Sequence, residues 1–247
     1  MSAHITTQCL DGVMIVTLAR LDKKNALTQA MYRQLAEALK QAEADEAVRA
    51  VLLRGNDQCF SAGNDLHDFM SLPDVSRDGP ILAFLTALAA FSKPLVAAVA
   101  GPAVGIGTTA LLHCDLVVAD AGSRFQLPFV ALGLCPEAGS SALLAQRVGQ
   151  AKARQWLLTG QPFDAAEALH HGLINEVVEG GVCERGLALA RQLAALPAGA
   201  MQASKALLNK WSRAEIQACI EDEAAVFGRL LRGEECQAAV RAFFSRG

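Results

Sequence analysis

Two loops contain small residues and could bind an anion through backbone N–H groups. They span 59–66 (CFSAGNDL) and 101–108 (GPAVGIGT), and each follows an apolar stretch typical of a buried strand. Small residues let a ligand approach the backbone, and consecutive N–H groups in such turns form anion-binding nests. If one N–H from each loop converged on a single oxygen, the two would form an oxyanion hole. From the residues alone, a tight loop with an Asn/Asp helix cap is the favoured explanation of the first loop, and close helix–strand packing is an alternative for the second.

A carboxylate lies further along the chain, at Glu137 in CPEAGSS. It is a candidate general base, but it also precedes a predicted helix, where a carboxylate complements the helix dipole. Cys59 and Cys135 lie near these segments, and neither is paired in sequence with a histidine that could activate it. The run His113-Cys114-Asp115 is too short for a metal site. Neither GxGxxG nor a Walker motif occurs, so no nucleotide cofactor is predicted.

The elements that must position these residues follow from apolar periodicity. Strands are expected at 12–18, 48–54, 95–100 and 115–119, and alternation places Val13, Ile15 and Thr17 on one face of the first. Helices are expected from Thr28, from 64–65, over 81–91, from Gly107 to His113, and over 138–148, 152–158 and 164–172. Beyond 182 the pattern is helical only, and Pro197 separates two helices. Ser212 is predicted to cap the penultimate helix, and the last helix is expected over 234–244.

Composition excludes several classes of protein. The chain has 247 residues, 52% of them hydrophobic, and a net charge of −3. It is too apolar to be disordered and has no basic excess for nucleic acid. Its seven cysteines form no CxxC pair, which indicates a reduced, cytoplasmic protein. The uncharged run 94–112 is broken by prolines and glycines, so a strand, a turn and a helix are expected there rather than a membrane span.

The motifs together resemble the crotonase, or enoyl-CoA hydratase/isomerase, superfamily. The resemblance is carried by LDKKNALT (21–28), FSAGNDL (60–66), GPAVGIG (101–107), HCDLVVAD (113–120) and LGLCPEAGSS (132–141), and extends over 152–178. It covers nearly the whole chain in order. The motifs SAGNDL and GPAVGIG are most similar to the Δ3,Δ2-enoyl-CoA isomerase branch.

The resemblance implies an α/β fold in which ββα units form a spiral core over 1–190, followed by a helical trimerisation region over 191–247. It also implies an acyl-CoA thioester substrate and a homotrimer or hexamer. No cofactor is expected, because CoA is part of the substrate, and no metal, nucleic acid or membrane is expected as a partner.

By resemblance, the backbone N–H groups of Asn64 and Ile106 are the oxyanion donors and Glu137 is the base. The implied CoA and substrate contacts are Lys23, Lys24, Ala26, Ser61, Ala62, Gly63, Asp65, Leu66 and Gly105. Lys205, Arg241 and Arg246 are candidates for the 3′-phosphate, and the stretch 67–91 is expected to wall the acyl pocket.

The reaction is predicted by counting carboxylates. Hydratases of this superfamily carry two glutamates, and their positions fall at Thr109 and Phe129 here, so a single-glutamate isomerase is favoured. That enzyme moves the double bond of a 3-enoyl-CoA to the 2-position. The alternatives are hydration, thioester hydrolysis, dehalogenation through Asp68 or Asp74, and an inactive acyl-CoA-binding protein.

Overall fold

The computed structural model describes residues 4–70, 79–210 and 212–245. Its main sheet runs in the order β1-β2-β3-β4-β6-β9 across the described residues. These strands are β1 (Ile5–Leu10), β2 (Val13–Leu18), β3 (Ala50–Arg54), β4 (Leu95–Val99), β6 (Leu116–Asp120) and β9 (Glu176–Val178). Only the β1–β2 pair is antiparallel; the other neighbours are parallel. The four predicted strands are confirmed as β2, β3, β4 and β6.

The described helices connect these strands and then form the C-terminal part of the chain. Short 3-10 helices are η1 (Leu21–Lys23), η2 (Ala110–His113) and η3 (Val130–Leu132). The α-helices before residue 180 are α1 (Gln29–Ala44), α2 (Leu66–Met70), α3 (Pro80–Ala90), α4 (Ile106–Thr109), α5 (Ser140–Val148), α6 (Gln150–Thr159) and α7 (Ala165–His170). Those after it are α8 (Val182–Ala194), α9 (Ala198–Asn209), α10 (Arg213–Leu231) and α11 (Glu234–Phe244).

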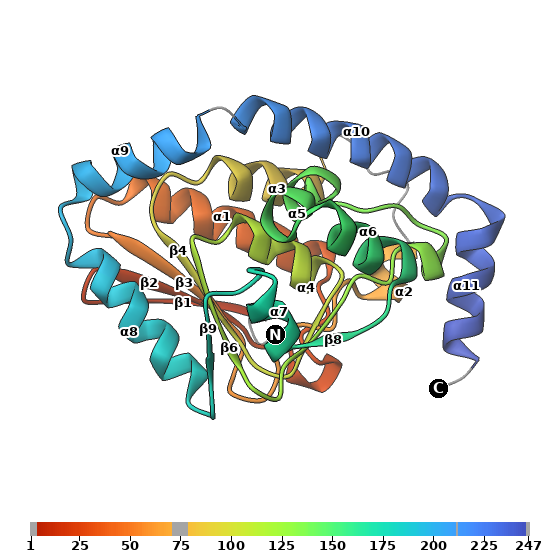
Figure 1. Cartoon of the computed structure of the whole chain (residues 1–247), viewed down its shortest axis with the longest axis horizontal. Helices are drawn as coiled ribbons and strands as arrows, with labels where there is room; N and C mark the ends of the chain where they lie inside the picture. The colour runs from red at the N-terminus through yellow and green to blue at the C-terminus, as the bar shows by residue number, and fades with distance from the viewer. Residues whose placement is uncertain (1–3, 71–78, 211, 246–247) are drawn as a thin grey trace.

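Both faces of the sheet are buried, as the strong apolar character of its parallel strands requires. On β2, Val13 and Ile15 pack with residues of α8 on one face, as the alternation predicts. Met14 and Val16 belong to the larger cluster on the other face, which includes side chains of α1 and α3. Figure 1 shows α8 on one side of the strands and α1 with α3 on the other.

A small second sheet begins directly after strand β4 of the main sheet. Strand β5 (Pro102–Val104) follows β4 directly and pairs in parallel with β7 (Arg124–Gln126), which pairs antiparallel with β8 (Phe163–Asp164). This turn of the chain from one sheet into another matches the spiral that the resemblance implies. The 101–108 loop, which includes β5, therefore connects the main sheet to the second sheet.

The predicted caps can be compared with the observed helix ends. Thr28 caps α1 by accepting from the N–H of Met31 at 3.3 Å, and Asp164 caps α7 by accepting from Glu167 at 2.8 Å. Two predictions were wrong. The hydroxyl of Ser212 does not cap α10 but points to the carbonyl of Asn209. Helix α5 begins at Ser140 rather than 138, because the preceding residues have left-handed backbone conformations.

The C-terminal helices α9 and α10 run along one side of the molecule, and α11 folds down beside α2 (Figure 1). The ring of Phe244 on α11 stacks on His67 of α2, with centroids 4.1 Å apart. Helix α10 buries Ile216, Ile220 and Phe227 against the core, as the sequence predicts. Among the described helices, none is both long and apolar enough to cross a membrane.

Candidate active site

The two small-residue loops lie against each other. The N–H of Ser61 donates to the carbonyl of Pro102 at 2.9 Å, and the N–H of Val104 donates to the carbonyl of Ser61 at 3.0 Å. The approach is so close that a Cβ on Gly63 would lie 2.8 Å from the carbonyl oxygen of Val104. Gly63 also has a φ of +92°, which only glycine adopts readily. The backbone therefore holds the two loops in direct contact.

The two predicted donors are available in this arrangement. The backbone on either side of Asn64 is held by Leu27, whose N–H donates to Gly63 and whose carbonyl accepts from Asp65, both near 2.8–2.9 Å. No acceptor for the N–H of Asn64 or Ile106 occurs among the described residues. The Ile106 N–H opens α4, where the helix leaves its first N–H groups unpaired. Both groups can thus donate to a ligand.

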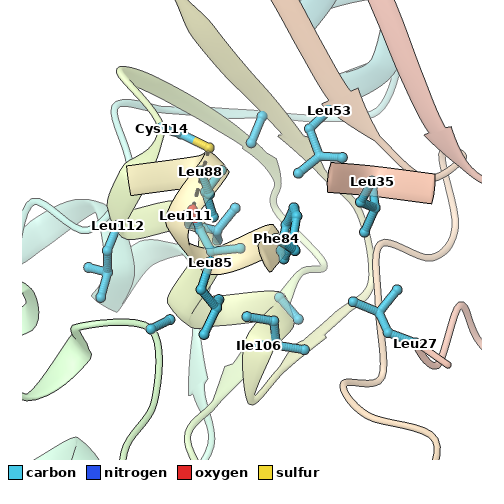
Figure 2. Close-up of a cluster of buried hydrophobic side chains, with 14 of the residues drawn as sticks. Leu27, Leu35, Leu53, Phe84, Leu85, Leu88, Ile106, Leu111, Leu112 and Cys114 are labelled. Atoms are coloured by element: carbon cyan, nitrogen blue, oxygen red, sulfur yellow. Dashed lines mark hydrogen bonds between the residues drawn. The ribbon is translucent and has the colours of Figure 1, made fainter. Parts of the chain in front are cut away.

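The side chain of Ile106 anchors its own N–H. It is 1% exposed and belongs to the main hydrophobic cluster together with Leu27, Phe84 and Leu85. Figure 2 shows these side chains around the short helix α4. Because the side chain is fixed on the core, the peptide N–H is held in place without a side-chain contact to the ligand.

The early turn is clamped to the first loop by Asn25, which sequence reasoning named only as part of 23–26. Asn25 is fully buried, and its amide donates to the carbonyls of Cys59 and Phe60 at 3.2 and 2.9 Å. The Ser61 hydroxyl donates to the Asn25 carbonyl, so that hydroxyl is used inside the protein. Lys23 and Lys24 are exposed at the turn, and the carbonyl of Lys24 accepts from the N–H of Ala62.

A half-buried ion pair that the sequence did not reveal joins the same two segments. The Arg20 guanidinium donates to Asp65 at 2.7 Å and to the carbonyl of Ala26 at 2.8 Å. The other oxygen of Asp65 accepts from the N–H groups that open α2, just before the half-buried Leu66. Both carboxylate oxygens of Asp65 therefore accept hydrogen bonds from groups within the protein. The sequence does not indicate a role for Arg20, because a single basic residue after a strand belongs to no motif.

Glu137 lies in an apolar environment without a hydrogen-bond partner for Oε1 among the described residues. It is 6% exposed, and it is the one acidic side chain of a cavity lined otherwise by Ile81, Leu82, Leu85, Ala138, Ile220, Ala224 and Phe227. Burial, with a smaller effect from the nearby Glu223, raises the pKa of Glu137 to about 8. A carboxyl group in this state can accept and return a proton near neutral pH.

The alternative role of Glu137 as a helix cap does not hold. The N-terminus of α5 is occupied by another carboxylate, that of Glu223 on α10. Its two oxygens accept from the N–H groups of Gly139 and Ser141 at 2.6 and 2.8 Å. Sequence reasoning missed Glu223, because its partners lie more than 80 positions away.

Tyr32 connects the base to the first donor loop. Its hydroxyl donates to the side-chain oxygen of Asn64 at 2.5 Å, and its ring is 1% exposed. Burial and the charge of Glu137 raise the pKa of Tyr32 well above its usual value, so the phenol stays protonated. This electrostatic effect also indicates that Glu137 lies close to the same tyrosine.

The two positions that hold glutamates in hydratases are buried here. Thr109 is 0% exposed in α4, and Phe129 is 4% exposed just before η3. The neighbouring thiols have raised pKa values: that of Cys135 rises to about 11, mainly because of burial. Burial likewise raises the pKa of Cys59. Protonated thiols are poor nucleophiles, which agrees with the absence of a paired histidine in sequence.

Two of the candidate phosphate contacts can be placed. Lys205 is buried, and its ammonium donates to Asp115 at 2.7 Å and to the carbonyl of Lys93 at 2.8 Å. These two bonds join α9 to the segments that precede β4 and β6. Arg241 is exposed on α11, and Arg246 lies outside the described residues.

Of the candidate dehalogenase residues, Asp68 accepts from the N–H of Gln29 at 2.6 Å, and Asp74 lies outside the described residues.

The comparisons with known proteins agree with the family resemblance that the motifs carry. The family model described as enoyl-CoA hydratase/isomerase matches residues 8–247. The chain is 36% identical to enoyl-CoA delta isomerase 2 of Rattus norvegicus, covering 95% of this chain and 62% of that protein. It thus spans less than two thirds of that relative's length. It is 34% identical to the 2,3-dehydroadipyl-CoA hydratase of Escherichia coli, covering 95% of this chain and 92% of that protein.

A solved structure described as Pseudomonas aeruginosa OdaA matches the fold with a TM-score of 0.95 and 45% identity. The match covers 98% of this chain and 99% of that one. The family model covers nearly the whole chain, and the relatives carry both isomerase and hydratase names. Sequence motifs, fold and comparisons therefore agree that this chain is a member of the enoyl-CoA hydratase/isomerase family, within the crotonase superfamily.

Proposed function

We propose that the protein moves the double bond of a 3-enoyl-CoA to the 2-position. The observation that carries the proposal is a single buried carboxyl group, Glu137, which lines an otherwise apolar cavity and whose Oε1 has no hydrogen-bond partner among the described residues. An isomerisation needs one group to remove a proton from C2 and return it to C4. One carboxyl group with a pKa near 8 is suited to both transfers.

The thioester carbonyl would accept hydrogen bonds from the N–H groups of Asn64 and Ile106. Removal of the C2 proton places negative charge on that oxygen, and the preorganised donors stabilise the enolate. A single donor of this kind is typically worth about 2.7–4 kcal/mol in the transition state. Glu137 then delivers its proton to C4, and the carbonyl re-forms with the double bond at the 2-position.

The cavity beside Glu137 supports an aliphatic acyl group. Its walls come from α3 and α10, and apart from Glu137 they are alkyl or aromatic side chains. A charged acyl end would lose its hydration there without gaining a partner. Helix α3 lies within the stretch 67–91 that was predicted to wall the pocket, and α10 adds a second wall.

Hydration is the second candidate, because one relative is named a hydratase. A two-carboxylate hydration needs a second acid, and Thr109 and Phe129 supply none at the matching positions. The variant Thr109→Glu with Phe129→Glu should therefore raise water addition to a 2-enoyl-CoA, if it folds. An inactive acyl-CoA-binding protein is the candidate of another class, and the buried, unpartnered Glu137 favours an enzyme instead.

One experiment separates these candidates. Purified protein is incubated with trans-3-hexenoyl-CoA and, separately, with trans-2-hexenoyl-CoA, and the products are resolved by chromatography and mass. The proposal predicts conversion of the 3-enoyl to the 2-enoyl thioester without a gain of 18 mass units. A hydrated product from both substrates, or free acid, would support the other family reactions, and binding without turnover would support the inactive protein.

The trimer or hexamer also remains a proposal. Leu207 and Leu208 at the end of α9 are 66% and 82% exposed. Two adjacent leucines in solvent are unfavourable, which supports a subunit contact. Light scattering at micromolar concentration tests it, and a monomer mass would contradict it.

A further inference from the structure

Glu223 combines two features that concern the proposed base directly. It is 8% exposed on α10, yet both its oxygens hold N–H groups of the segment that follows Glu137. Its negative charge also contributes to the raised pKa of Glu137. The two hydrogen bonds tie the Glu223 side chain directly to the backbone of that segment.

The segment that Glu223 holds has an unfavourable backbone conformation. Ala138 has a φ of +62° and Gly139 a φ of +72°. The left-handed conformation is unfavourable for an alanine, so surrounding contacts must impose it. The carbonyl of Ala138 accepts from Nε2 of His113 at 2.7 Å, and Glu223 holds the next residue. The direction of the Glu137 side chain thus depends on these contacts.

The same face of α10 carries the cavity wall. Three residues of this helix line the cavity. Ile220 lies three positions before Glu223, Ala224 one position after it, and Phe227 four positions after it. Positions with this spacing share one face of a helix. A single helix therefore places both the acyl wall and the carboxylate that holds the base.

We propose that Glu223 is a positioning residue for the reaction, which fixes the turn carrying Glu137 and sets a second negative charge beside it. This inference rests on the proposed role of Glu137 as the base. The other titratable or charged groups that act on this cluster within the described residues are Tyr32 on α1, His113 on η2, Cys135 before the turn, and Cys219 and Arg229 on α10. Of these, Tyr32 and Cys135 stay protonated at neutral pH, so Glu223 supplies the nearby negative charge.

The test measures the protonation of Glu137 without using turnover. Infrared difference spectra taken over a pH series follow the band of its protonated carboxyl, which is identified by its loss in Glu137→Gln. In Glu223→Gln the size is kept but the charge and one acceptor oxygen are lost. The titration midpoint should move to lower pH, and kcat should fall by up to about 10²-fold through misplacement of the base.

Two variants control for charge and for folding. Asp222→Asn removes one charge from an exposed neighbour on the same helix and should leave midpoint and kcat unchanged. Glu223→Asp keeps the charge on a shorter side chain, so the midpoint should stay near that of the wild type while kcat falls. If Glu223→Gln does not fold, Glu223→Asp decides the question: a folded variant with wild-type kcat overturns the proposal.

Failure of this inference can be distinguished from failure of the proposed function. A wild-type protein that does not isomerise 3-hexenoyl-CoA refutes the function, yet the titration still reports on Glu223 and Glu137. Conversely, an active enzyme in which Glu223→Gln leaves both midpoint and kcat unchanged refutes the role of Glu223 alone.

Discussion

The hydroxyl of Tyr32 donates a hydrogen bond to the side-chain oxygen of Asn64 across 2.5 Å. This bond joins α1 to the loop that supplies the first proposed oxyanion donor. The charge of Glu137 contributes to the raised pKa of Tyr32, so the same side chain also interacts electrostatically with the proposed base. The bond gives α1 a part in holding the loop, although α1 itself supplies no reacting group.

Tyr32→Phe should lower kcat by roughly 10-fold while the protein remains folded. The variant leaves the half-buried amide oxygen of Asn64 without its donor, a loss typically worth about 1 kcal/mol. Combining it with Asn64→Ala, which keeps the backbone N–H, forms a double-mutant cycle. Strong non-additivity in kcat is expected. Purely additive losses would indicate that the bond does not position the loop.

Ile106→Pro should lower turnover by about 10²-fold or more, because it removes one of the two proposed donors. Ile106 is the first residue of α4, a position where helices accept proline. Ile106→Val is the matched control, since it keeps the N–H and most of the apolar contact. Circular dichroism must report a folded Ile106→Pro variant. Wild-type turnover in that variant would show that Ile106 is not a donor.

Much of the fold could be predicted from the sequence, since buried strands and amphipathic helices have clear periodicity. Strand β1 was missed because it is an exposed edge strand without an apolar face. Strands β5, β7, β8 and β9 have two or three residues each, which is too few to display a period. Their pairing comes from the path of the whole chain.

The candidate site was predictable where a motif carries it, and not where distant contacts do. The loops at 60–66 and 101–107 and the carboxylate at 137 stand in recognisable motifs. Arg20, Tyr32 and Glu223 act through partners at least 30 positions away, and nothing local distinguishes them from ordinary residues. Ser61 was predicted to contact CoA, but its hydroxyl is buried and bonded to Asn25.

The raised pKa of Glu137 makes stability depend on pH. Its ordinary value is 4.5 and its folded value about 8, so the folded state binds more protons between these values. The free energy of unfolding should therefore fall as pH rises through this window, by an amount on the order of a few kcal/mol. Glu137→Gln lacks this contribution.

Urea denaturation at pH 5 to 9 tests this dependence. The stability of Glu137→Gln relative to the wild type should increase up to about pH 8 and then level off. Two curves that remain parallel over the whole range would contradict a carboxyl group buried in its protonated form.

Free CoA at millimolar concentration should raise the melting temperature of the protein by mass action. The proposed contacts are the exposed turn at Lys23 and Lys24 and the backbone of the adjoining loop at 61–66. ATP is the matched control, because it carries an adenine and phosphates without the pantetheine arm. A shift with ATP and none with CoA would refute the CoA site.

The central claim is that Glu137 alone moves the proton. Glu137→Gln keeps the size of the side chain and removes the base, so bond migration in trans-3-hexenoyl-CoA should fall by about 10²–10⁴-fold. CoA affinity should stay close to that of the wild type, since Glu137 is not one of the proposed CoA contacts. The measurement is kcat for conversion to the 2-enoyl thioester by the folded variant. Migration at the wild-type rate, or hydration that Glu137→Gln leaves intact, would contradict the account.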